Sequence, residues 1–168
     1  MKMKLLHPIL FLALGLHGAC ASDVNLAAVP DAVAGCEAPT EDLLVPEAPM
    51  LPGRHCIACH TEKGQADGLN WTAAGTIYAK QGSRCNTGGL EGVKVEIADD
   101  TRKILITLYT NRTGNFFTSE IRDFSRVRVR ISKDGVTKEM VGTQPSADCP
   151  SCHYPGGQAP LGRIYLMD

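Results

Sequence analysis

The sequence predicts a mainly β fold: a small antiparallel β-sandwich flanked by two loop-rich segments that each carry a C-x-x-C-H motif. Three observations predict it. Short runs of β-branched and aromatic residues recur between residues 73 and 142, and clusters of Asn, Asp, Ser and Gly separate them. The motif segments on either side are polar and contain glycine. A chain of 168 residues has room for one main core, so a single sandwich is expected.

Six runs are expected to form the strands. They are 75–80, 93–98, 104–110, 115–120, 126–132 and 136–141. The turn signals NTGG, ADDTRK, NRTGN and SKDG interrupt these runs. Strands this short at near-regular spacing are typical of an antiparallel sandwich or barrel. We expect four aromatic side chains of these strands to pack in the core: Tyr78, Tyr109, Phe116 and Phe117.

The run RVRVRI at 126–131 alternates arginine with apolar residues, which places three arginines on one face of a strand. Such a row could bind anionic groups, or it could form a solvated face that opposes aggregation. We favour the solvated face.

The first residues are typical of a secretory signal peptide, predicted to span 1–21. Two lysines precede an apolar stretch at 8–16 that is too short to cross a bilayer, and small residues follow it. A-C-A at 19–21 fits ordinary signal cleavage, whereas G-A-C at 18–20 is similar to a bacterial lipobox with histidine where leucine is usual. Cys20 is therefore a lipidation candidate. Either cleavage predicts an exported bacterial protein that is periplasmic, outer-membrane-anchored or extracellular, with membrane contact only through this lipid anchor.

Residues 22–53 are predicted to be an acidic, Pro/Ala-rich linker, with six acidic residues and no lysine or arginine. Residues 54–168 contain fifteen basic and twelve acidic residues and form the predicted folded domain, with its β-sandwich core at about 73–142. The net charge of −1 does not indicate a strongly basic nucleic-acid-binding protein, so no nucleic-acid partner is expected.

Seven cysteines are present, and six remain when Cys20 is set aside. Four of the six lie in the two motifs. The other two, Cys36 and Cys85, are a disulfide candidate because an exported chain folds in an oxidising compartment.

The motifs are HCIACH at 55–60 and CPSCH at 149–153. Two cysteines separated by two residues can both reach the vinyl groups at one edge of a haem, and the histidine that follows then lies beneath the iron. Two such motifs in a small exported chain predict two covalently attached haems of the c type. The predicted thioether cysteines are Cys56, Cys59, Cys149 and Cys152, and the predicted proximal iron ligands are His60 and His153.

One histidine and three methionines are the candidates for the sixth iron ligands. The predicted mature chain contains one further histidine, His55, which could reach the second haem or a haem of a neighbouring molecule but not its own. It could equally be a surface residue. Met140 is the first methionine candidate, since a thioether sulfur suits a low-spin electron carrier, and its alternative role is core packing. Met50 and Met167 are weaker candidates. An iron without a sixth ligand would permit ligand binding or peroxide chemistry.

The motifs have alternative explanations besides haem attachment. The four motif cysteines could form a tetrahedral zinc site in an exported structural or interaction β-domain, but this gives the two trailing histidines no role. A thioredoxin-like redox pair would need a βαβ context, which is not predicted here. No nucleophile–base pair, phosphate loop or paired carboxylate stands at recognisable spacing, so an electron carrier is expected rather than an enzyme. A small haem peroxidase or sensor is a further alternative.

On the two C-x-x-C-H motifs, the chain resembles a small exported di-haem c-type cytochrome. The stretch 75–132 also resembles the transthyretin-like or carboxypeptidase-regulatory-like β-sandwich, on the segments GTIYAK, GVKVEI and TNRTGNF. The resemblance implies electron transfer, with the β module holding the two haem-bearing segments together. It also implies other redox proteins or cytochromes as partners, and it leaves self-association open.

Overall fold

The computed structural model describes residues 52–64, 66, 68–81, 88–120, 122–153 and 162–167. The predicted signal peptide and the linker as far as residue 51 lie outside these residues, as do Cys20, Cys36, Met50 and Cys85. In the described part of the chain, no helix is both long and apolar enough to cross a membrane.

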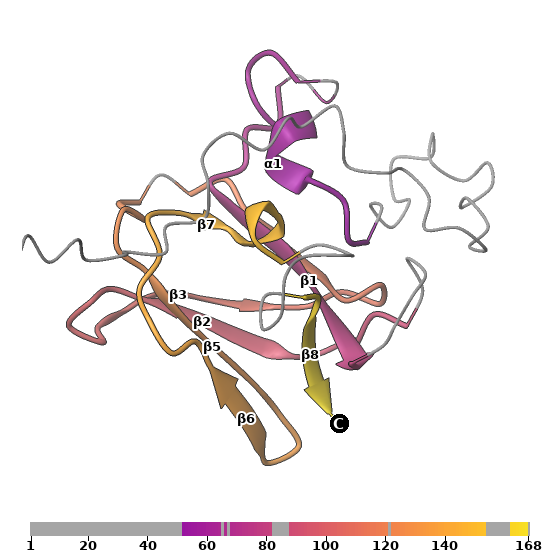
Figure 1. Cartoon of the computed structure of the whole chain (residues 1–168). Helices are drawn as coiled ribbons and strands as arrows, with labels where there is room; N and C mark the ends of the chain where they lie inside the picture. Colours follow the sequence, from indigo (N-terminus) through magenta and orange to yellow (C-terminus); the bar gives the residue numbers. More distant parts are fainter. Residues whose placement is uncertain are drawn as a thin grey trace, which may run out of the picture.

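The described residues form two four-stranded sheets, whose arrangement can be followed in Figure 1. In chain order the described elements are α1 (Cys56–Cys59), β1 (Ala73–Lys80), β2 (Lys94–Ala98), β3 (Ile104–Tyr109), β4 (Asn115–Thr118), β5 (Arg128–Lys133), β6 (Val136–Glu139), β7 (Ala147–Asp148), the 3₁₀ helix η3 (Cys149–Ser151) and β8 (Ile164–Met167). The first sheet has the order β4-β1-β7, with β8 also paired to β1, and the second has the order β3-β2-β5-β6. The mainly β fold class that the sequence predicts is confirmed.

All six predicted strands are present as β1 to β6, with ends that differ from the prediction by at most two residues. The second motif differs from its prediction, because it lies between two strands, β7 and β8, in a segment predicted to be loop. Both strands pair in parallel with β1. Strands of two and four residues are too short to show a periodic pattern, and their partner strand is distant in the sequence.

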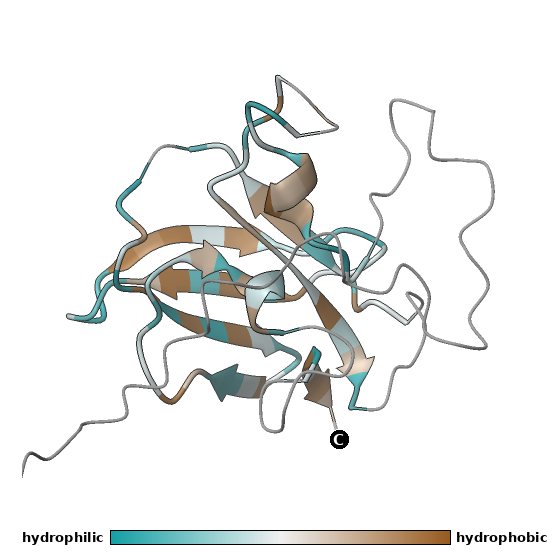
Figure 2. Ribbon diagram, turned by 45° about the horizontal axis from the view of Figure 1, so that its top comes forward, coloured by the Kyte–Doolittle hydropathy of each residue, from teal (hydrophilic) through white to brown (hydrophobic). Residues whose placement is uncertain are grey.

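The core lies between the two sheets, and apolar side chains at alternate strand positions form it (Figure 2). Its buried members are Ala73, Ile77, Val93, Val95, Ile97, Ile106, Phe116, Phe124, Val127, Val129, Ile131, Ala147 and Leu166. Of the aromatic residues predicted to pack here, Phe116 is in the core and Tyr78 is buried on the other face of β1. Phe117 and Tyr109 are exposed, so the prediction is wrong for these two. Successive side chains of a strand point to opposite faces, so Phe116 and Phe117 cannot both face the core.

The central strand β1 is covered on both faces. Ala73 and Ile77 point into the core, whereas Thr76 and Tyr78 lie on the opposite face. The segment before α1 reaches this opposite face, where the N–H of Gly53 donates to the hydroxyl oxygen of Thr76 (2.9 Å). Coverage from both sides explains why the first six residues of β1 are all buried.

The two edges of β1 have different neighbours. On one edge β4 pairs with the first half of the strand, and Gly89 bridges to Tyr78 in the second half. β7 and β8 therefore pair with the other edge, β7 beside the first half and β8 beside the second. The second motif follows β7 directly and precedes β8, and both of these strands pair with β1 (Figure 1).

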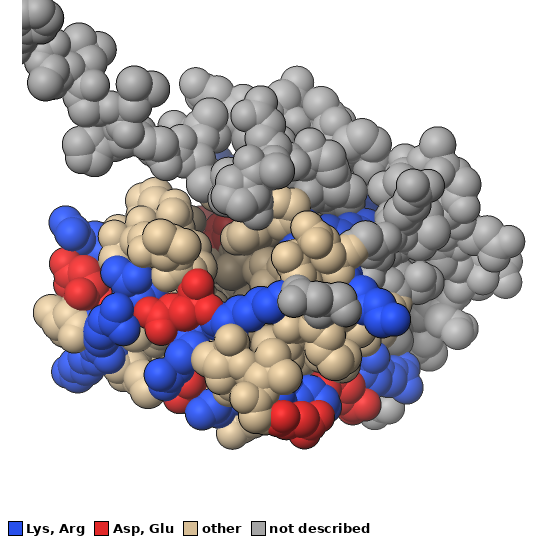
Figure 3. Space-filling model, turned by 60° about the horizontal axis from the view of Figure 1, so that its bottom comes forward, with Lys and Arg blue, Asp and Glu red and all other residues tan. Residues whose placement is uncertain are grey.

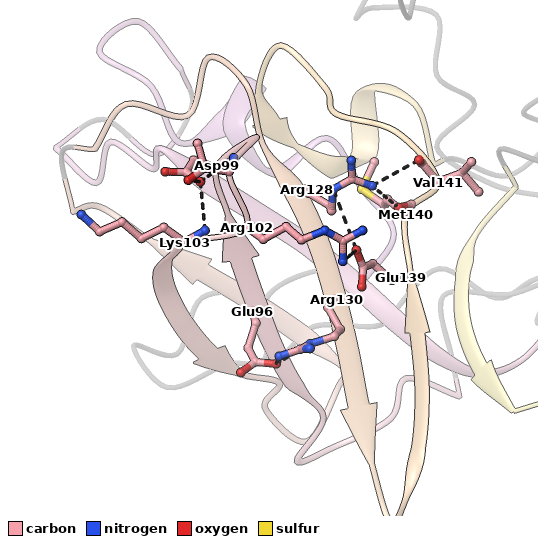
Figure 4. Close-up of polar contacts among 10 residues, drawn as sticks. Glu96, Asp99, Arg102, Lys103, Arg128, Arg130, Glu139, Met140 and Val141 are labelled. Carbon is pink, nitrogen blue, oxygen red and sulfur yellow. Dashed lines mark hydrogen bonds and ion pairs between the residues drawn. The ribbon is translucent and has the colours of Figure 1, made fainter.

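The row of arginines on and before β5 is matched by carboxylates of neighbouring segments, and Figure 4 shows the partners of Arg128 and Arg130. The ion pairs are Arg126–Asp100, Arg128–Glu139 and Arg130–Glu96, with nitrogen–oxygen distances of 2.9, 3.8 and 2.8 Å. Positive and negative side chains are mixed on the face that Figure 3 shows. A row whose charges are neutralised in this way is a poor anion-binding surface, which supports the solvated face that the sequence favours.

Candidate functional site

The first motif forms a single helical turn, α1, that is fastened to β1 at both ends. Before it, Gly53 donates to Thr76 on β1 (2.9 Å). After it, the N–H of Trp71 donates to the carbonyl of His60 (3.0 Å), and β1 begins two residues later. Within the turn, the N–H of His60 donates to the carbonyl of Cys56 (2.9 Å). These bonds hold His60 close to the start of β1.

A glycine closes the loop that follows α1. A Cβ at Gly64 would clash with the carbonyl of Cys59, and the same carbonyl accepts a hydrogen bond from the N–H of Ala66 (2.9 Å). The loop can therefore approach the second cysteine of the motif only because residue 64 has no side chain.

The second motif forms η3, which begins directly at the sheet. Pro150 is buried in the first turn, where its missing N–H leaves no hydrogen bond unmade. The N–H groups of Cys152 and His153 donate to the carbonyl of Cys149 (3.2 and 2.9 Å). Because β7 immediately precedes η3 and pairs with β1, the motif is fixed to the same strand as the first one.

Asp148 brings the two motifs together. In the register of β7 with β1 it lies opposite Ala74, so its side chain is on the face of β1 that the first motif covers. There its charge interacts with His55 and with Cys56. Burial raises the pKa of Asp148, and His55 opposes this rise in part. The Oδ1 atom of Asp148 has no hydrogen-bond partner within the described part of the chain. The motifs are therefore neighbours in space, although they are far apart in the sequence.

Two of the motif cysteines are partly buried, and their thiols have raised pKa values. Burial, and after it the charge of Asp148, raises the pKa of Cys56 to about 12. Burial, Asp148 and Cys56 raise the pKa of Cys149 to about 12 as well. Cys149 also packs against the core, beside Gly75. Both groups are neutral thiols at pH 7 and are weak nucleophiles.

Cys152 differs from the other motif cysteines. Cys56, Cys59 and Cys149 are free thiols, whereas Cys152 is disulfide-bonded, and its partner lies outside the described residues. One sulfur cannot form a disulfide and a thioether at once. Haem attachment at Cys152 therefore requires that this disulfide is first reduced.

The two histidines of the first motif are buried without polar partners. His55 is 8% exposed and His60 is 3% exposed, and none of their four ring nitrogens has a hydrogen-bond partner in the described structure. Burial lowers the pKa of His60, and the backbone of Leu69 lies close enough to offset this in part without an aligned hydrogen bond. Buried polar atoms without partners are costly, so such atoms are expected where a bound group satisfies them.

His153 is oriented by a backbone carbonyl. Its Nδ1 atom lies 2.9 Å from the oxygen of Gly162. If Nδ1 carries the proton and donates it here, the lone pair of Nε2 is available to a metal. Histidines that bind metals usually have their second nitrogen held in this way.

Trp71 belongs to this region, although nothing in the sequence pattern points to it. Its ring stacks on the ring of His60 on one face and on Phe117 on the other, with centroid separations of 3.5 and 4.2 Å. The only signal in the sequence is that it is the single tryptophan of the chain. The stack depends on the pairing of β4 with β1, which the order of residues along the chain does not reveal.

Met140, a predicted sixth-ligand candidate, lies in a packing position. Its side chain is partly buried against the core. Its N–H donates to the carbonyl of Val129 (3.0 Å), and its own carbonyl accepts from Arg128 (3.2 Å; Figure 4). These are the surroundings of a core methionine, the alternative role considered for this residue.

Comparison with protein-family models, curated protein sequences and solved structures finds no match for the chain. The case for a function therefore depends on the chemistry and placement of its own residues.

A four-cysteine zinc site is not formed among the described residues, where no three His, Cys, Asp or Glu side chains are grouped to hold a metal ion. A zinc site of this kind needs four thiolates. Because Cys152 is in a disulfide in this arrangement, the four motif cysteines cannot all bind one zinc ion until that disulfide is reduced.

Proposed function

We propose that this chain is an exported electron-transfer protein that carries two covalently attached c-type haems. The observation that carries the proposal is the pair of C-x-x-C-H motifs, both fastened to β1. Three buried or half-buried histidines in these motifs support it, because two of them have no polar partner in the described structure and the third is held through Nδ1.

A bound haem would supply an iron that takes up and releases one electron between its ferric and ferrous states. In this proposal Cys56 and Cys59 form the thioethers of the first site, and His60 is its proximal ligand. Cys149 and Cys152 have the same role at the second site once Cys152 is reduced. There the contact between His153 and a backbone carbonyl fixes the tautomer with Nε2 toward the iron.

His55 is the histidine that we propose as sixth ligand of the second haem. It is buried, its ring nitrogens have no partner in the described part of the chain, and it interacts with the charge of Asp148, which directly precedes the second motif. The first site then has no further histidine of its own domain available. Its sixth ligand would be a methionine or a group of another molecule, and otherwise the position would be open.

The β-sandwich has a mechanical role in this proposal. Both motifs are fastened to a strand that is buried on both faces and paired on both edges, so their separation is fixed by the most constrained element of the fold. A fixed separation between two redox groups would favour electron exchange within the molecule. Exported redox proteins or other cytochromes are the partners expected for such a carrier.

Haem content tests the proposal directly. The full chain, produced with its own N-terminal segment in a bacterium that attaches haem outside the cytoplasm, should show two haem additions by intact mass after denaturation. A pyridine haemochrome assay should agree with this count. A colourless protein without added mass, or one that binds a single zinc ion, would contradict the proposal and would favour a structural β-domain.

Two reciprocal variants then assign the haems. Cys56→Ser/Cys59→Ser and Cys149→Ser/Cys152→Ser should each retain one haem, so each serves as the control for the other. Loss of both haems in either variant, with the protein still folded, would argue against two independent attachment sites.

A second pair of variants tests which residues are the sixth ligands of the two haem irons. His55→Ala should remove the low-spin bis-histidine spectrum of one haem. Met140→Leu retains most of the apolar volume and, as a packing residue, should leave the spectrum unchanged. Loss of a near-infrared sulfur-to-iron band in Met140→Leu would instead identify Met140 as a ligand.

A further inference from the structure

Three aromatic rings form a stack beside the first motif. The rings of His60 and Trp71 are 3.5 Å apart between centroids and inclined by 12°. The rings of Trp71 and Phe117 are 4.2 Å apart and inclined by 10°. Trp71 is thus nearly parallel to both neighbours and lies between them.

The backbone holds Trp71 in this place. Its N–H donates to the carbonyl of His60 (3.0 Å), which ties it to the end of the motif. The next residue, Thr72, donates from its N–H to the carbonyl of Thr118 (2.8 Å) and from its hydroxyl to the carbonyl of Glu120 (2.7 Å). Phe117 is itself placed by the pairing of β4 with β1. The tryptophan is therefore attached to the motif on one side and to the sheet on the other.

Stacking of this kind restricts one rotation of the imidazole and involves its face rather than its edge. A ring pressed face to face against a larger ring cannot turn about its bond to Cβ without losing contact. Both nitrogens lie on the edge of an imidazole, and a bond from nitrogen to iron lies in the plane of the ring. The stack therefore sets the direction in which the nitrogens of His60 point without covering either of them.

The two proximal-ligand candidates are held in different ways. A metal-binding histidine is normally oriented by a hydrogen bond from its second nitrogen, and His153 has such a contact with Gly162. His60 has none in the described structure, although it is the more buried of the two. Instead of a hydrogen bond, the stacked ring of Trp71 contacts the imidazole of His60.

We propose that Trp71 is a positioning residue for His60: by stacking, it fixes the plane of the imidazole and so its orientation toward the iron. This inference rests on the proposed function for the ligand role of His60, but the stack itself does not. Phe117 supports the far face of Trp71 and is 42% exposed, so the chain should tolerate its truncation.

The first experiment needs no haem. The full chain, produced in the cytoplasm without haem attachment, is examined by two-dimensional NMR of its histidine ring protons. Ring current from Trp71 should shift the ring protons of His60 upfield. Trp71→Phe should retain part of this shift and Trp71→Ala should lose it. Tyr109→Ala removes an exposed aromatic side chain outside the stack and should have no effect. Unchanged His60 resonances in Trp71→Ala would overturn the stack.

The second experiment uses the haem-loaded protein. In low-spin ferric haem, the pattern of paramagnetically shifted haem methyl resonances depends on the orientation of the axial histidine plane. Trp71→Ala should change this pattern at one haem while intact mass still shows two haems. Trp71→Phe and Tyr109→Ala should retain the wild-type pattern. Rescue by phenylalanine separates positioning from a general loss of structure.

The outcomes distinguish the two claims. A wild-type pattern in Trp71→Ala would overturn the positioning role and leave the proposed function intact. A wild-type chain without haem would overturn the proposed function and, with it, the ligand role of His60, even if the NMR of the haem-free chain verifies the stack. If Trp71→Ala does not fold, Phe117→Ala takes its place. It should alter the methyl pattern of the same haem to a smaller degree, and an unchanged pattern would count against the inference.

Discussion

The reactivity of the motif cysteines is determined residue by residue. Cys56 and Cys149 are held as thiols because burial and the nearby Asp148 both disfavour the thiolate. Cys152 has no thiol, since it is in a disulfide. The motifs therefore present chemically different sulfurs before any cofactor is attached, although their sequences are alike.

Alkylation tests this assignment in the haem-free chain. At pH 8, Cys56 and Cys149 should react with iodoacetamide much more slowly in the folded protein than after denaturation, because both pKa values are raised to about 12. Cys152 should be labelled only after reduction. Mass spectrometry of peptides gives each rate separately. Rapid labelling of Cys149 in the folded chain would contradict its packing against the core.

A single glycine allows the second motif to approach the sheet. A Cβ at Gly75 would lie 2.7 Å from the ring of Phe116 and 3.0 Å from the Cβ of Cys149. Gly75→Ala should therefore destabilise the protein by about 1–3 kcal/mol, because the core and η3 must move apart. Urea unfolding measures the difference. Gly142→Ala is the matched control, since a Cβ there meets nothing within 4 Å, and equal unfolding midpoints for the two variants would contradict the close contact.

At the scale of elements, the second sheet is joined by a cross-strand ion pair. Glu96 on β2 lies opposite Arg130 on β5, and the Nε–H of Arg130 donates a hydrogen bond to the Glu96 carboxylate (2.9 Å). The Nη2 atom of Arg130 and the Nζ atom of Lys94 form ion pairs with the same carboxylate at 2.8 and 3.2 Å. Burial alone would raise the pKa of Glu96. The hydrogen bonds and charges of Arg130 and Lys94 outweigh burial and hold this pKa below its ordinary value of 4.5.

This pair predicts how stability depends on pH. A carboxyl group with a lowered pKa stabilises the fold above its unfolded pKa, and this contribution is lost as the pH falls below about 4.5 and through the folded pKa. At pH 7, Glu96→Gln should cost about 1–2 kcal/mol, a modest figure because Arg130 is 46% exposed. In this variant the free energy of unfolding should also fall less steeply as the pH is lowered below about 4.5. Glu120→Gln, in an exposed pair with Arg122, is the control and should change stability by less than about 0.5 kcal/mol.

At the scale of the whole molecule, β1 connects the two motifs with each other and with the core. It pairs with β4, β7 and β8, contacts both motif helices and contributes to the core. The sheet that contains it is therefore complete only when the segments before residue 73 and after residue 142 are in place. We therefore expect the sandwich and the two motifs to fold as one cooperative unit.

A fragment tests this cooperativity. Residues 73–142 alone lack β7, β8 and the cover over one face of β1, so they should fail to give a dispersed NMR spectrum or a sharp thermal transition. The chain from residue 52 to 168 is the control and should give both. A folded, monomeric 73–142 fragment would contradict this and would show that the motifs are attached to an independent β unit.

The sequence by itself determines the strands β1 to β6 and the spacing of cysteine and histidine in the two motifs. Alternation of apolar and polar residues and the presence of turn residues are local features of the sequence. Short strands such as the one around Val129 can therefore be predicted without a structure. The spacing of Cys56, Cys59 and His60 is also local, and it limits the group that can be attached there.

Tertiary structure alone decides the rest. The strands β7 and β8 exist because an edge of β1 is available to them, and two to four residues carry no pattern that could predict this pairing. Three further features depend on which strands become neighbours. They are the interaction of His55 with Asp148, the stack of Trp71 on His60 and the packing of Met140 against the core. Such contacts join residues far apart in the chain, and their free energy arises only after the sheets have assembled.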